Sequence, residues 1–243
     1  MRQEGSGQDA VRAGTPFRKE NSEGTAETMP NVRTFIAVDL PTEVKSQIGE
    51  ILSPLKPLSR SIRWVRAAGL HLTLKFLGEI PEEQLPDLVT ALEEVLFGRA
   101  AFDFRLSGLG GFPNLRRPRV LWIGVPEGDE PLRELAGAVE KALIPCGYPP
   151  EKRPFSPHLT IGRVRSPRGI EPVLDRLPAV DFDSGPVTAG AVKVMKSQLK
   201  PTGAEYSALK IIPLKAPAAG DGPEDHNDPI DRESGEPSSD PTP

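Results

Sequence analysis

Two segments of this chain begin with the same three residues, histidine, leucine and threonine, followed by an aliphatic side chain. HLTLKFLG occupies residues 71–78 and HLTIGRV occupies residues 158–164, so two of the three histidines in 243 residues open such a segment. Average residue usage gives this coincidence a chance on the order of one in ten thousand. A single histidine of this kind is usually structural, but the repeat favours one function shared by both HLT segments.

Each HLT segment has the alternation of a β-strand, in which successive side chains point to opposite faces. His71 and Thr73 therefore share one face of the first strand, while the leucine between them faces the core. His158 and Thr160 share a face of the second strand in the same way. If the two strands meet across a cleft, two imidazoles and two hydroxyls surround a common point.

This set of side chains suits the cleavage of a phosphodiester. A neutral imidazole can take a proton from the attacking oxygen while a protonated imidazole gives one to the leaving oxygen, and the near-neutral pKa of histidine allows both roles at one pH. The threonine hydroxyls can donate hydrogen bonds to the non-bridging phosphate oxygens. The chemistry requires no metal and no cofactor, so we expect neither.

Other kinds of site fit the surrounding residues poorly. Neither HLT segment has Cys, Asp or Glu at the short spacing that zinc ligands share. Ser156 lies near His158 but lacks the GxSxG surroundings of a hydrolase nucleophile. No GxxxxGK[ST] loop is present, so the use of a nucleoside triphosphate is not indicated.

The rest of the sequence predicts the elements that position the histidines. FIAVDLP at 35–41 and VLWIGVP at 120–126 each read as a strand closed by proline, and each is followed by a helical stripe and then by an HLT segment. Further helices are predicted from Pro81 to residue 96 and near 170–177, and further strands at 62–65, 102–106, 187–199 and 206–213. The order predicts a duplicated, bilobal α+β fold, with two antiparallel sheets and outer helices around a central cleft.

Composition sets the limits of the domain. Residues 1–28 and the acidic tail 216–243 are rich in Gly, Pro, Ser and acids, so we expect both to be disordered and the folded domain to span residues 29–215. The tail carries a formal charge of -7 and the domain +4, which permits an anionic ligand. One cysteine, Cys146, excludes an internal disulfide, and no apolar run approaches the roughly 18 residues of a membrane helix. We expect a monomeric protein of the cytoplasm with no membrane partner.

The segments RTFIAVDLP, HLTLKFLGEI, RRPRVLWIGV, RPFSPHLTIGRV and KSQLKPTGAEYSAL together resemble the 2H phosphoesterases, specifically the RNA 2',3'-cyclic phosphodiesterase branch, historically called 2'-5' RNA ligases. The resemblance spans roughly residues 33 to 214. It implies hydrolysis of an RNA-terminal 2',3'-cyclic phosphate to a 2'-phosphomonoester without ATP or metal. It also implies that His71 is the proton donor, His158 the proton acceptor, and Thr73 and Thr160 the phosphate-binding residues.

Five basic residues are further candidates for contact with RNA. Lys75 shares the alternation face of His71, although it could equally be a solvated lysine at the strand end. Arg163 has the opposite parity to His158, so a phosphate contact would require an irregularity in the strand. Arg116, Arg117 and Arg119 precede the strand at 120–126 and would meet the RNA backbone or serve only solubility. Three aromatic residues, Trp64, Phe76 and Trp122, are expected in the core.

The sequence leaves several functions open beside hydrolysis of RNA ends. The same site could join RNA ends by 2'-5' ligation, in which an RNA 5'-hydroxyl replaces water. It could also act on a small-molecule cyclic phosphate, since only the cleft walls would differ. A module that binds RNA ends without chemistry is disfavoured, because binding alone has no need of two titratable imidazoles.

Overall fold

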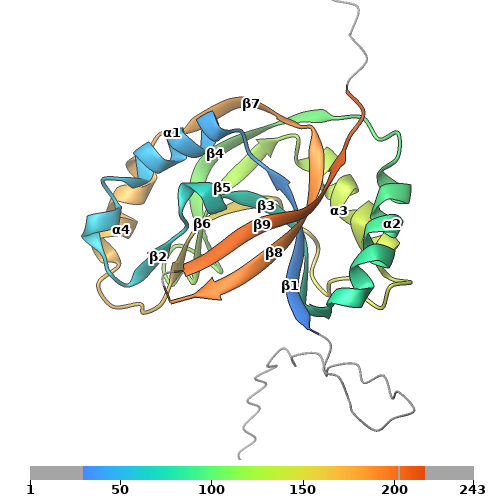
Figure 1. Cartoon of the computed structure of the whole chain (residues 1–243). Coiled ribbons are helices and arrows are strands. Elements are labelled where there is room, and N and C mark those ends of the chain that lie inside the picture. The colour runs from blue at the N-terminus through green and yellow to red at the C-terminus, as the bar shows by residue number, and fades with distance from the viewer. Residues whose placement is uncertain (1–29, 202, 217–243) are drawn as a thin grey trace, which may run out of the picture.

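The computed structural model describes residues 30–201 and 203–216 of the chain (Figure 1). Its strands are β1 (Asn31–Asp39), β2 (Ile62–Trp64), β3 (His71–Pro81), β4 (Phe102–Phe112), β5 (Val120–Glu127), β6 (His158–Val164), β7 (Asp183–Ala189), β8 (Ala191–Lys200) and β9 (Gly203–Pro213). Its helices are α1 (Thr42–Leu52), α2 (Leu85–Leu96), α3 (Asp129–Leu143) and α4 (Glu171–Arg176), with short 3-10 turns η1 (Lys56–Leu58), η2 (Ala67–Gly69), η3 (Glu82–Gln84) and η4 (Leu177–Ala179).

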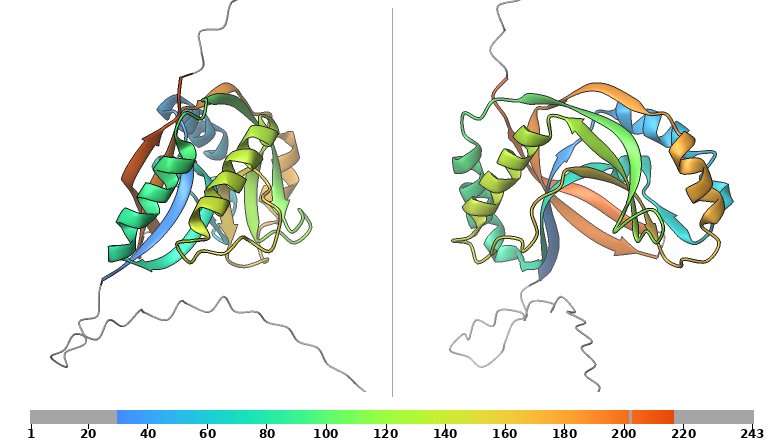
Figure 2. Two further views of the ribbon diagram at one scale, coloured as in Figure 1. Left: turned by 90° about the vertical axis from the view of Figure 1, so that its right-hand side faces the viewer. Right: turned by 180° about the vertical axis from the view of Figure 1, so that it is seen from behind.

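The strands form two antiparallel sheets. One has four strands in the order β3-β1-β8-β9, and the other has five in the order β2-β6-β5-β4-β7. The helices α2 and α3 lie together at one end of the molecule, while α1 and α4 lie at the other (Figures 1 and 2). The edge strand β3 of the first sheet approaches β6 of the second to within 8 Å between Cα atoms. This arrangement confirms the predicted α+β fold, and it places both HLT segments where the sheets meet.

The duplication predicted from the sequence is present, but its two copies exchange strands. β1 and β3 of the N-terminal copy pair with each other, whereas β4 of that copy pairs with β5 in the other sheet. Conversely, β8 leaves the C-terminal copy and pairs with β1. Each sheet therefore holds strands from both copies, and neither lobe is a continuous half of the chain.

The helices form where apolar residues recur at helical spacing. In α1, which follows Pro41, the buried residues are Val44, Ile48 and Leu52, four positions apart. The helix α3 is preceded by Gly128, whose φ is 76° and where an added Cβ would lie 2.5 Å from a carbonyl oxygen of β4. Only glycine fits this tight turn between β5 and the helix.

Most of the predicted elements are confirmed, with two corrections. The strand expected at 187–199 is in fact two strands, β7 and β8, which belong to different sheets. The helix expected to open at Pro81 begins at Leu85, because Pro81 still belongs to β3 and a 3-10 turn follows. The segments predicted to be disordered, 1–28 and all but the first residue of 216–243, lie outside the described residues. Within the described part, no helix is long and apolar enough to cross a membrane.

Candidate active site

The first HLT segment opens β3 and contains a β-bulge. Lys75 pairs with Ile36 and Thr73 pairs with Ala37, so two steps along β3 match one step along β1. Leu74 and Lys75 are consequently both buried, where strict alternation would bury only one of them. The bulge reverses the faces of Lys75 and Phe76, and a second register shift follows between Phe76 and Gly78.

The second HLT segment repeats this irregularity in β6. Gly162 pairs with Leu121 and Thr160 pairs with Trp122, so Ile161 is the extra residue of this bulge. Ile161 and Gly162 are both buried, as are Leu74 and Lys75 in β3. The two HLT segments therefore share a backbone conformation as well as their residue types.

The prediction that Lys75 shares a face with His71 is wrong, because the bulge turns its side chain into the protein. Lys75 is only 4% exposed, and its Nζ donates hydrogen bonds to the carbonyl oxygen of Pro149 (2.8 Å) and to Oε1 of Glu140 (3.4 Å). The same Oε1 accepts a hydrogen bond from the backbone N–H of Glu151 (2.7 Å). Lys75 thus ties α3 and the loop before β6 to β3, and it is not available to RNA.

The bulge in β6 has the opposite effect on Arg163, which alternation alone had placed away from His158. Arg163 is exposed and lines the same cavity as His71 and Thr73. Its positive charge lowers the pKa of both histidines. The irregularity that a phosphate contact would require is therefore present, and the guanidinium lies close to both imidazoles.

Both imidazoles are held by the same kind of hydrogen bond, which joins Nδ1 to a backbone carbonyl oxygen. Nδ1 of His71 lies 2.8 Å from the carbonyl oxygen of Gly69, and Nδ1 of His158 lies 2.7 Å from the carbonyl oxygen of Ser156. A carbonyl oxygen can only accept, so Nδ1 must carry the proton in each ring. The neutral form of each histidine consequently presents an unprotonated Nε2, the atom that a general base requires.

Burial favours the neutral form of both histidines. It lowers the pKa of His71 to about 4, and the hydrogen bond to Gly69 and the negative charge of Asp39 offset only part of that effect. Burial also lowers the pKa of His158, again with partial compensation by its backbone hydrogen bond. Both rings are therefore neutral near pH 7 when no ligand is bound.

A cavity of about 670 Å³ opens beside His71. The side chains around it include His71, Thr73 and Arg163, the rings of Phe35, Trp64, Phe76 and Tyr206, and the cations Arg33, Arg63 and Arg66. The ring of Phe35 stacks on His71 with centroids 4.6 Å apart, and the ring of Tyr206 meets His71 edge-on at 5.1 Å. Aromatic faces and cations in one cavity suit a nucleotide, which carries a base and a phosphate.

A smaller cavity of about 240 Å³ lies beside His158. It is bounded by Phe112, Trp122, Gly124, Val125, Asp129, Arg133, Ser156 and Pro157. The Phe112 ring meets His158 edge-on, with centroids 4.9 Å apart. Each histidine therefore faces its own cavity, one large and cationic, the other small and aromatic.

The residue paired across the sheet from each histidine also differs. His71 pairs with Asp39 of β1, whereas His158 pairs with Gly124 of β5. Asp39 bonds to Lys45 (2.5 Å) and Lys193 (2.6 Å). Burial alone would raise the pKa of Asp39, but these lysines hold it below its ordinary value, so the carboxylate stays charged.

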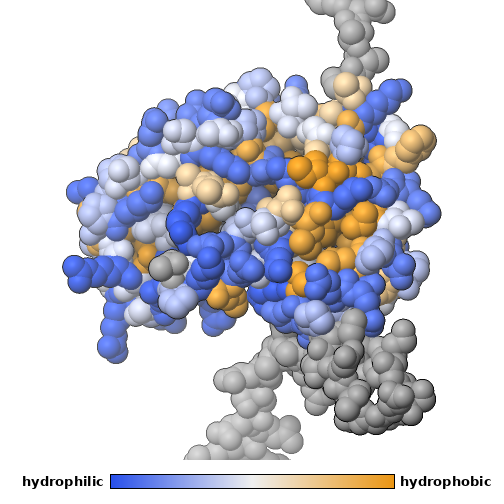
Figure 3. Space-filling model, viewed as in Figure 1, coloured by the Kyte–Doolittle hydropathy of each residue, from blue (hydrophilic) through white to orange (hydrophobic). Residues whose placement is uncertain are grey.

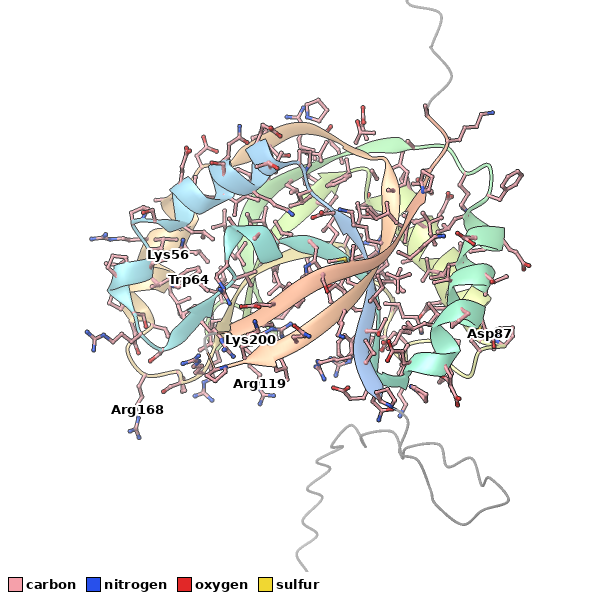
Figure 4. The ribbon with its side chains drawn as sticks, in the orientation of Figure 1. Lys56, Trp64, Asp87, Arg119, Arg168 and Lys200 are labelled. Carbon is pink, nitrogen blue, oxygen red and sulfur yellow. The ribbon has the colours of Figure 1, made fainter. Side chains whose placement is uncertain are left out.

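The arginines predicted before β5 lie in an exposed turn. Asn114 Oδ1 accepts hydrogen bonds from the backbone N–H groups of Arg116 and Arg117, and Arg119 joins β6 through its carbonyl oxygen and Val164 N (2.9 Å). Their side chains are exposed and line neither cavity, and Arg119 is seen at the lower edge of Figure 4. Contact between these side chains and RNA stays a prediction.

The expectation that three aromatic residues lie in the core is wrong for Phe76. Its ring is 45% exposed and packs under the guanidinium of Arg33, whose Cζ lies 4.6 Å from the ring centroid. Trp64 is half-buried and packs against the core, whereas Trp122 is half-buried beside the ring of Phe112, and each also lines a cavity. Phe76 follows the bulge in β3 as Arg163 follows the bulge in β6, which explains why both are exposed.

The sequence reasoning missed several residues of the larger cavity, among them Arg63, Arg66 and Tyr206. One signal was available, since an isolated glycine within a strand, such as Gly162, often marks a bulge. No local pattern shows that Tyr206 of β9 lies against His71, because β1 and β8 separate β9 from β3 in the sheet. In the part of the chain that the structure describes, no three His, Cys, Asp or Glu side chains cluster so as to hold a metal ion.

Comparison with known families decides which class of protein carries this site. The family model of LigT-like phosphoesterases matches twice in succession, at residues 38–122 and 123–206. The chain belongs to the LigT-like phosphoesterase family. The two matches correspond to the two copies that exchange strands, and the resemblance to 2H phosphoesterases inferred from the HLT segments is confirmed.

Similar LigT-like proteins cover nearly the whole fold. The chain is 32% identical over 184 residues to the RNA 2',3'-cyclic phosphodiesterase of Methanothermobacter thermautotrophicus, covering 75% of this chain and 99% of that protein. It is 37% identical over 190 residues to the protein of the same name from Thermus thermophilus, covering 76% and 91%. The shared portion excludes mainly the two ends of the chain.

Solved structures of a relative give the same picture. The crystal structure of E. coli LigT complexed with 3'-AMP is 28% identical, with a TM-score of 0.61, and covers 76% of this chain and 98% of its own. The same relative complexed with ATP gives a TM-score of 0.59 at the same identity and coverage. The LigT-like fold of this chain is therefore shared with a protein that binds nucleotides.

Proposed function

We propose that this LigT-like phosphoesterase hydrolyses the 2',3'-cyclic phosphodiester at RNA ends to a 2'-phosphomonoester. The observation that carries the proposal is the matched pair of histidines, each on a bulged strand and each with Nδ1 bonded to a backbone carbonyl. The relatives named RNA 2',3'-cyclic phosphodiesterases support RNA as the substrate.

In the proposed reaction, His158 acts as the base. Its unprotonated Nε2 takes a proton from water, and the water oxygen forms a bond to phosphorus. The bond between phosphorus and O3' then breaks, and His71 gives its proton to O3' as that oxygen leaves. The product is a 2'-phosphomonoester with a free 3'-hydroxyl, and a proton transfer between the two histidines restores the starting state.

The donor role requires that His71 be protonated when the phosphate is bound. Its pKa of about 4 in the free protein opposes this, but the negative charge of a bound phosphodiester favours the imidazolium. Asp39 adds a second negative charge that raises the pKa of His71, whereas no such contribution acts on His158. Lys45 and Arg163 act on His71 in the opposite sense, so the donor and acceptor roles are taken from the resemblance to the 2H phosphoesterases and not from these charges.

The remaining groups would bind the phosphate itself. Thr73 and Thr160 stand beside the two histidines on the two strands and can donate to the non-bridging oxygens. Arg163 lines the cavity close to both imidazoles and can balance the charge that develops on those oxygens.

The test uses an RNA oligonucleotide that ends in a 2',3'-cyclic phosphate, incubated with the full-length protein and EDTA. We expect metal-independent turnover to the 2'-phosphate, identified by chromatography against both phosphate isomers. A 3'-phosphate product would reverse the leaving group. Binding of the RNA without any product would favour a module that binds RNA ends.

The small aromatic cavity favours 2'-5' RNA ligation as a second candidate. A 5'-terminal nucleoside that entered beside His158 could stack on Phe112 or Trp122 and present its 5'-hydroxyl to Nε2. The O5'–P bond would form as the P–O3' bond breaks, with His71 again supplying the proton to O3'. Incubation of the cyclic phosphate RNA with a 5'-hydroxyl oligonucleotide, followed by a search for a 2'-5' linked product, tests this candidate.

A further inference from the structure

Two arginines of the larger cavity lie directly opposite each other in a pair of strands. Arg63 of β2 pairs with Arg163 of β6 in the antiparallel register. Like charges at such positions repel and destabilise a sheet, because their Cβ atoms are only about 5 Å apart. In the part of the chain that the structure describes, neither arginine has a carboxylate partner. The protein therefore keeps an uncompensated pair of guanidinium groups at the cavity.

A third arginine joins this pair at the turn between β8 and β9. An added Cβ on Gly203 would lie 3.3 Å from Nη2 of Arg66 and 3.7 Å from Nη2 of Arg63, so both side chains converge on the same short stretch of backbone. Glu205 lies 3.9 Å from Arg66 and is also paired with Lys200. Arg66 therefore shares its carboxylate with a second cation.

The surface around this turn is strongly hydrophilic. Figure 3 shows polar side chains gathered over β2 and the tip of the β8–β9 hairpin, while apolar atoms lie toward the other end of β9. Figure 4 shows Trp64 and Lys200 in the same part of the molecule, far from Asp87 on α2. The excess positive charge is therefore local to one mouth of the cavity, and it fits a ligand with more than one negative charge.

We propose that Arg63, together with Arg66, binds the phosphodiester that precedes the terminal nucleotide, so that the enzyme prefers an RNA chain to a mononucleotide. The proposal rests on the proposed function, which places the cyclic phosphate between His71 and His158 and beside Arg163. Arg63 lies on the neighbouring strand, directly opposite Arg163, where it can meet the next phosphate of the RNA strand. The terminal nucleoside then spans the cavity between the two phosphates, against the rings of Phe76 and Tyr206.

The size of the cavity agrees with this arrangement. The cavity of about 670 Å³ is lined by Arg63, Arg66 and Arg163 as well as by the aromatic rings, so one nucleoside and its two flanking phosphates would each meet a suitable side chain. A cyclic mononucleotide would occupy the histidine end and leave Arg63 and Arg66 unpaired. Arg63 of β2, with Arg66 between β2 and η2, would thus separate RNA ends from small cyclic phosphates.

The experiment compares two substrates, adenosine 2',3'-cyclic phosphate and the dinucleotide ApA with a 2',3'-cyclic phosphate. We expect the full-length protein to show a kcat/KM for the dinucleotide at least about tenfold higher, the effect of one or two charge-assisted hydrogen bonds. Arg63→Gln should remove most of that ratio, and Arg63→Lys should keep more of it. The slope of log KM against log salt for the dinucleotide should fall by about 0.7 in Arg63→Gln, because one phosphate contact is lost.

Arg168→Gln is the matched control, since Arg168 is exposed, points away from the fold in Figure 4 and lines neither cavity. Arg168→Gln should leave the ratio of kcat/KM for the two substrates unchanged. Equal turnover of both substrates by the unaltered protein, or an equal loss for both in Arg63→Gln, would overturn the inference while the proposed function stands. No turnover of either substrate would reject the proposed function, and the inference with it.

Discussion

The two HLT segments have the same backbone and different surroundings. Each begins a strand with histidine, passes through a bulge after threonine and holds its imidazole through a carbonyl two residues earlier. Opposite His71 stands the carboxylate of Asp39, and opposite His158 stands Gly124, which lines the smaller cavity. The duplicated backbone therefore supplies matched geometry, while the residue across the sheet differs. In the proposed reaction, the proton donor would stand on the Asp39 side and the nucleophile on the Gly124 side.

The residues after the two bulges extend this difference. Position for position, buried Lys75 corresponds to Gly162, and Phe76 corresponds to Arg163. The first segment buries its cation, Lys75, in structural contacts and exposes the ring of Phe76 to the cavity. The second segment exposes its cation, Arg163. In the proposed function, one copy would offer a surface for a base and the other a charge for a phosphate.

The largest expected effect comes from removing either histidine. His71→Ala and His158→Ala should each lower the turnover of cyclic phosphate RNA by about 10²–10⁴-fold, the usual contribution of general acid or base catalysis. A 4-nitrophenyl phosphodiester, whose leaving group needs no proton, separates the two roles. It should restore activity to His71→Ala and not to His158→Ala. The reverse pattern would exchange donor and acceptor, and circular dichroism checks that both variants fold.

A side chain added at Gly124, opposite His158, should have the next largest effect on activity. An added Cβ at Gly124 would lie 3.1 Å from the Ser107 carbonyl oxygen and 3.3 Å from the Trp122 ring. Gly124→Val should therefore lower kcat by roughly tenfold or more, because small displacements of a catalytic group are costly. Gly190→Val is the control, since nothing lies within 4 Å of an added Cβ there. Steady-state kinetics that show equal rates for the two variants would argue against a nucleophile entrance beside Gly124.

The buried lysine should affect stability more than catalysis. Lys75→Met leaves the Pro149 carbonyl and Glu140 without their donor, so the free energy of unfolding should fall by about 1–3 kcal/mol. Lys56→Met, at an exposed lysine of η1, should change it little. Urea denaturation measures the free energy of unfolding of both variants. If Lys75→Met lost activity while keeping full stability, Lys75 would belong to the substrate site after all.

The smallest expected effect concerns pH. Because burial lowers the pKa of both histidines in the free protein, kcat/KM should reach its maximum below pH 6.5. The maximum of kcat should lie at higher pH, since the bound anion raises both pKa values. Asp39→Asn removes a charge that raises the pKa of His71, so the maximum of kcat/KM should move down by less than about one pH unit.

Measured pH profiles of kcat and kcat/KM with cyclic phosphate RNA decide this prediction. Asp87→Asn provides a comparison, because Asp87 lies on α2, far from Trp64 in Figure 4, and lines neither cavity. An upward shift in Asp39→Asn would show that the carboxylate does not support the imidazolium of His71.

Much of this molecule was predictable from residue patterns, since the HLT segments, the apolar stripes and the repeated order of elements are local signals. The faces of Lys75 and Arg163 were predicted incorrectly for one physical reason: period-two alternation fails at a bulge. The exchange of β4 and β8 depends on pairing between residues far apart in the chain, such as Phe35 with Met195, which no local pattern encodes. The cavity walls follow from that exchange, so they could not be predicted either.

The exchange of strands also affects how the protein folds during synthesis. β1 emerges first during synthesis, yet one of its neighbours, β8, ends at Lys200 near the end of the described chain. Contacts this distant in sequence form slowly, because the intervening chain must be ordered first. Lys193, which binds Asp39, belongs to this late-synthesised part of the chain. The β8–β9 hairpin, which lines the larger cavity, belongs to it as well. The nascent chain therefore contains both histidines before it contains all the strands that form the site.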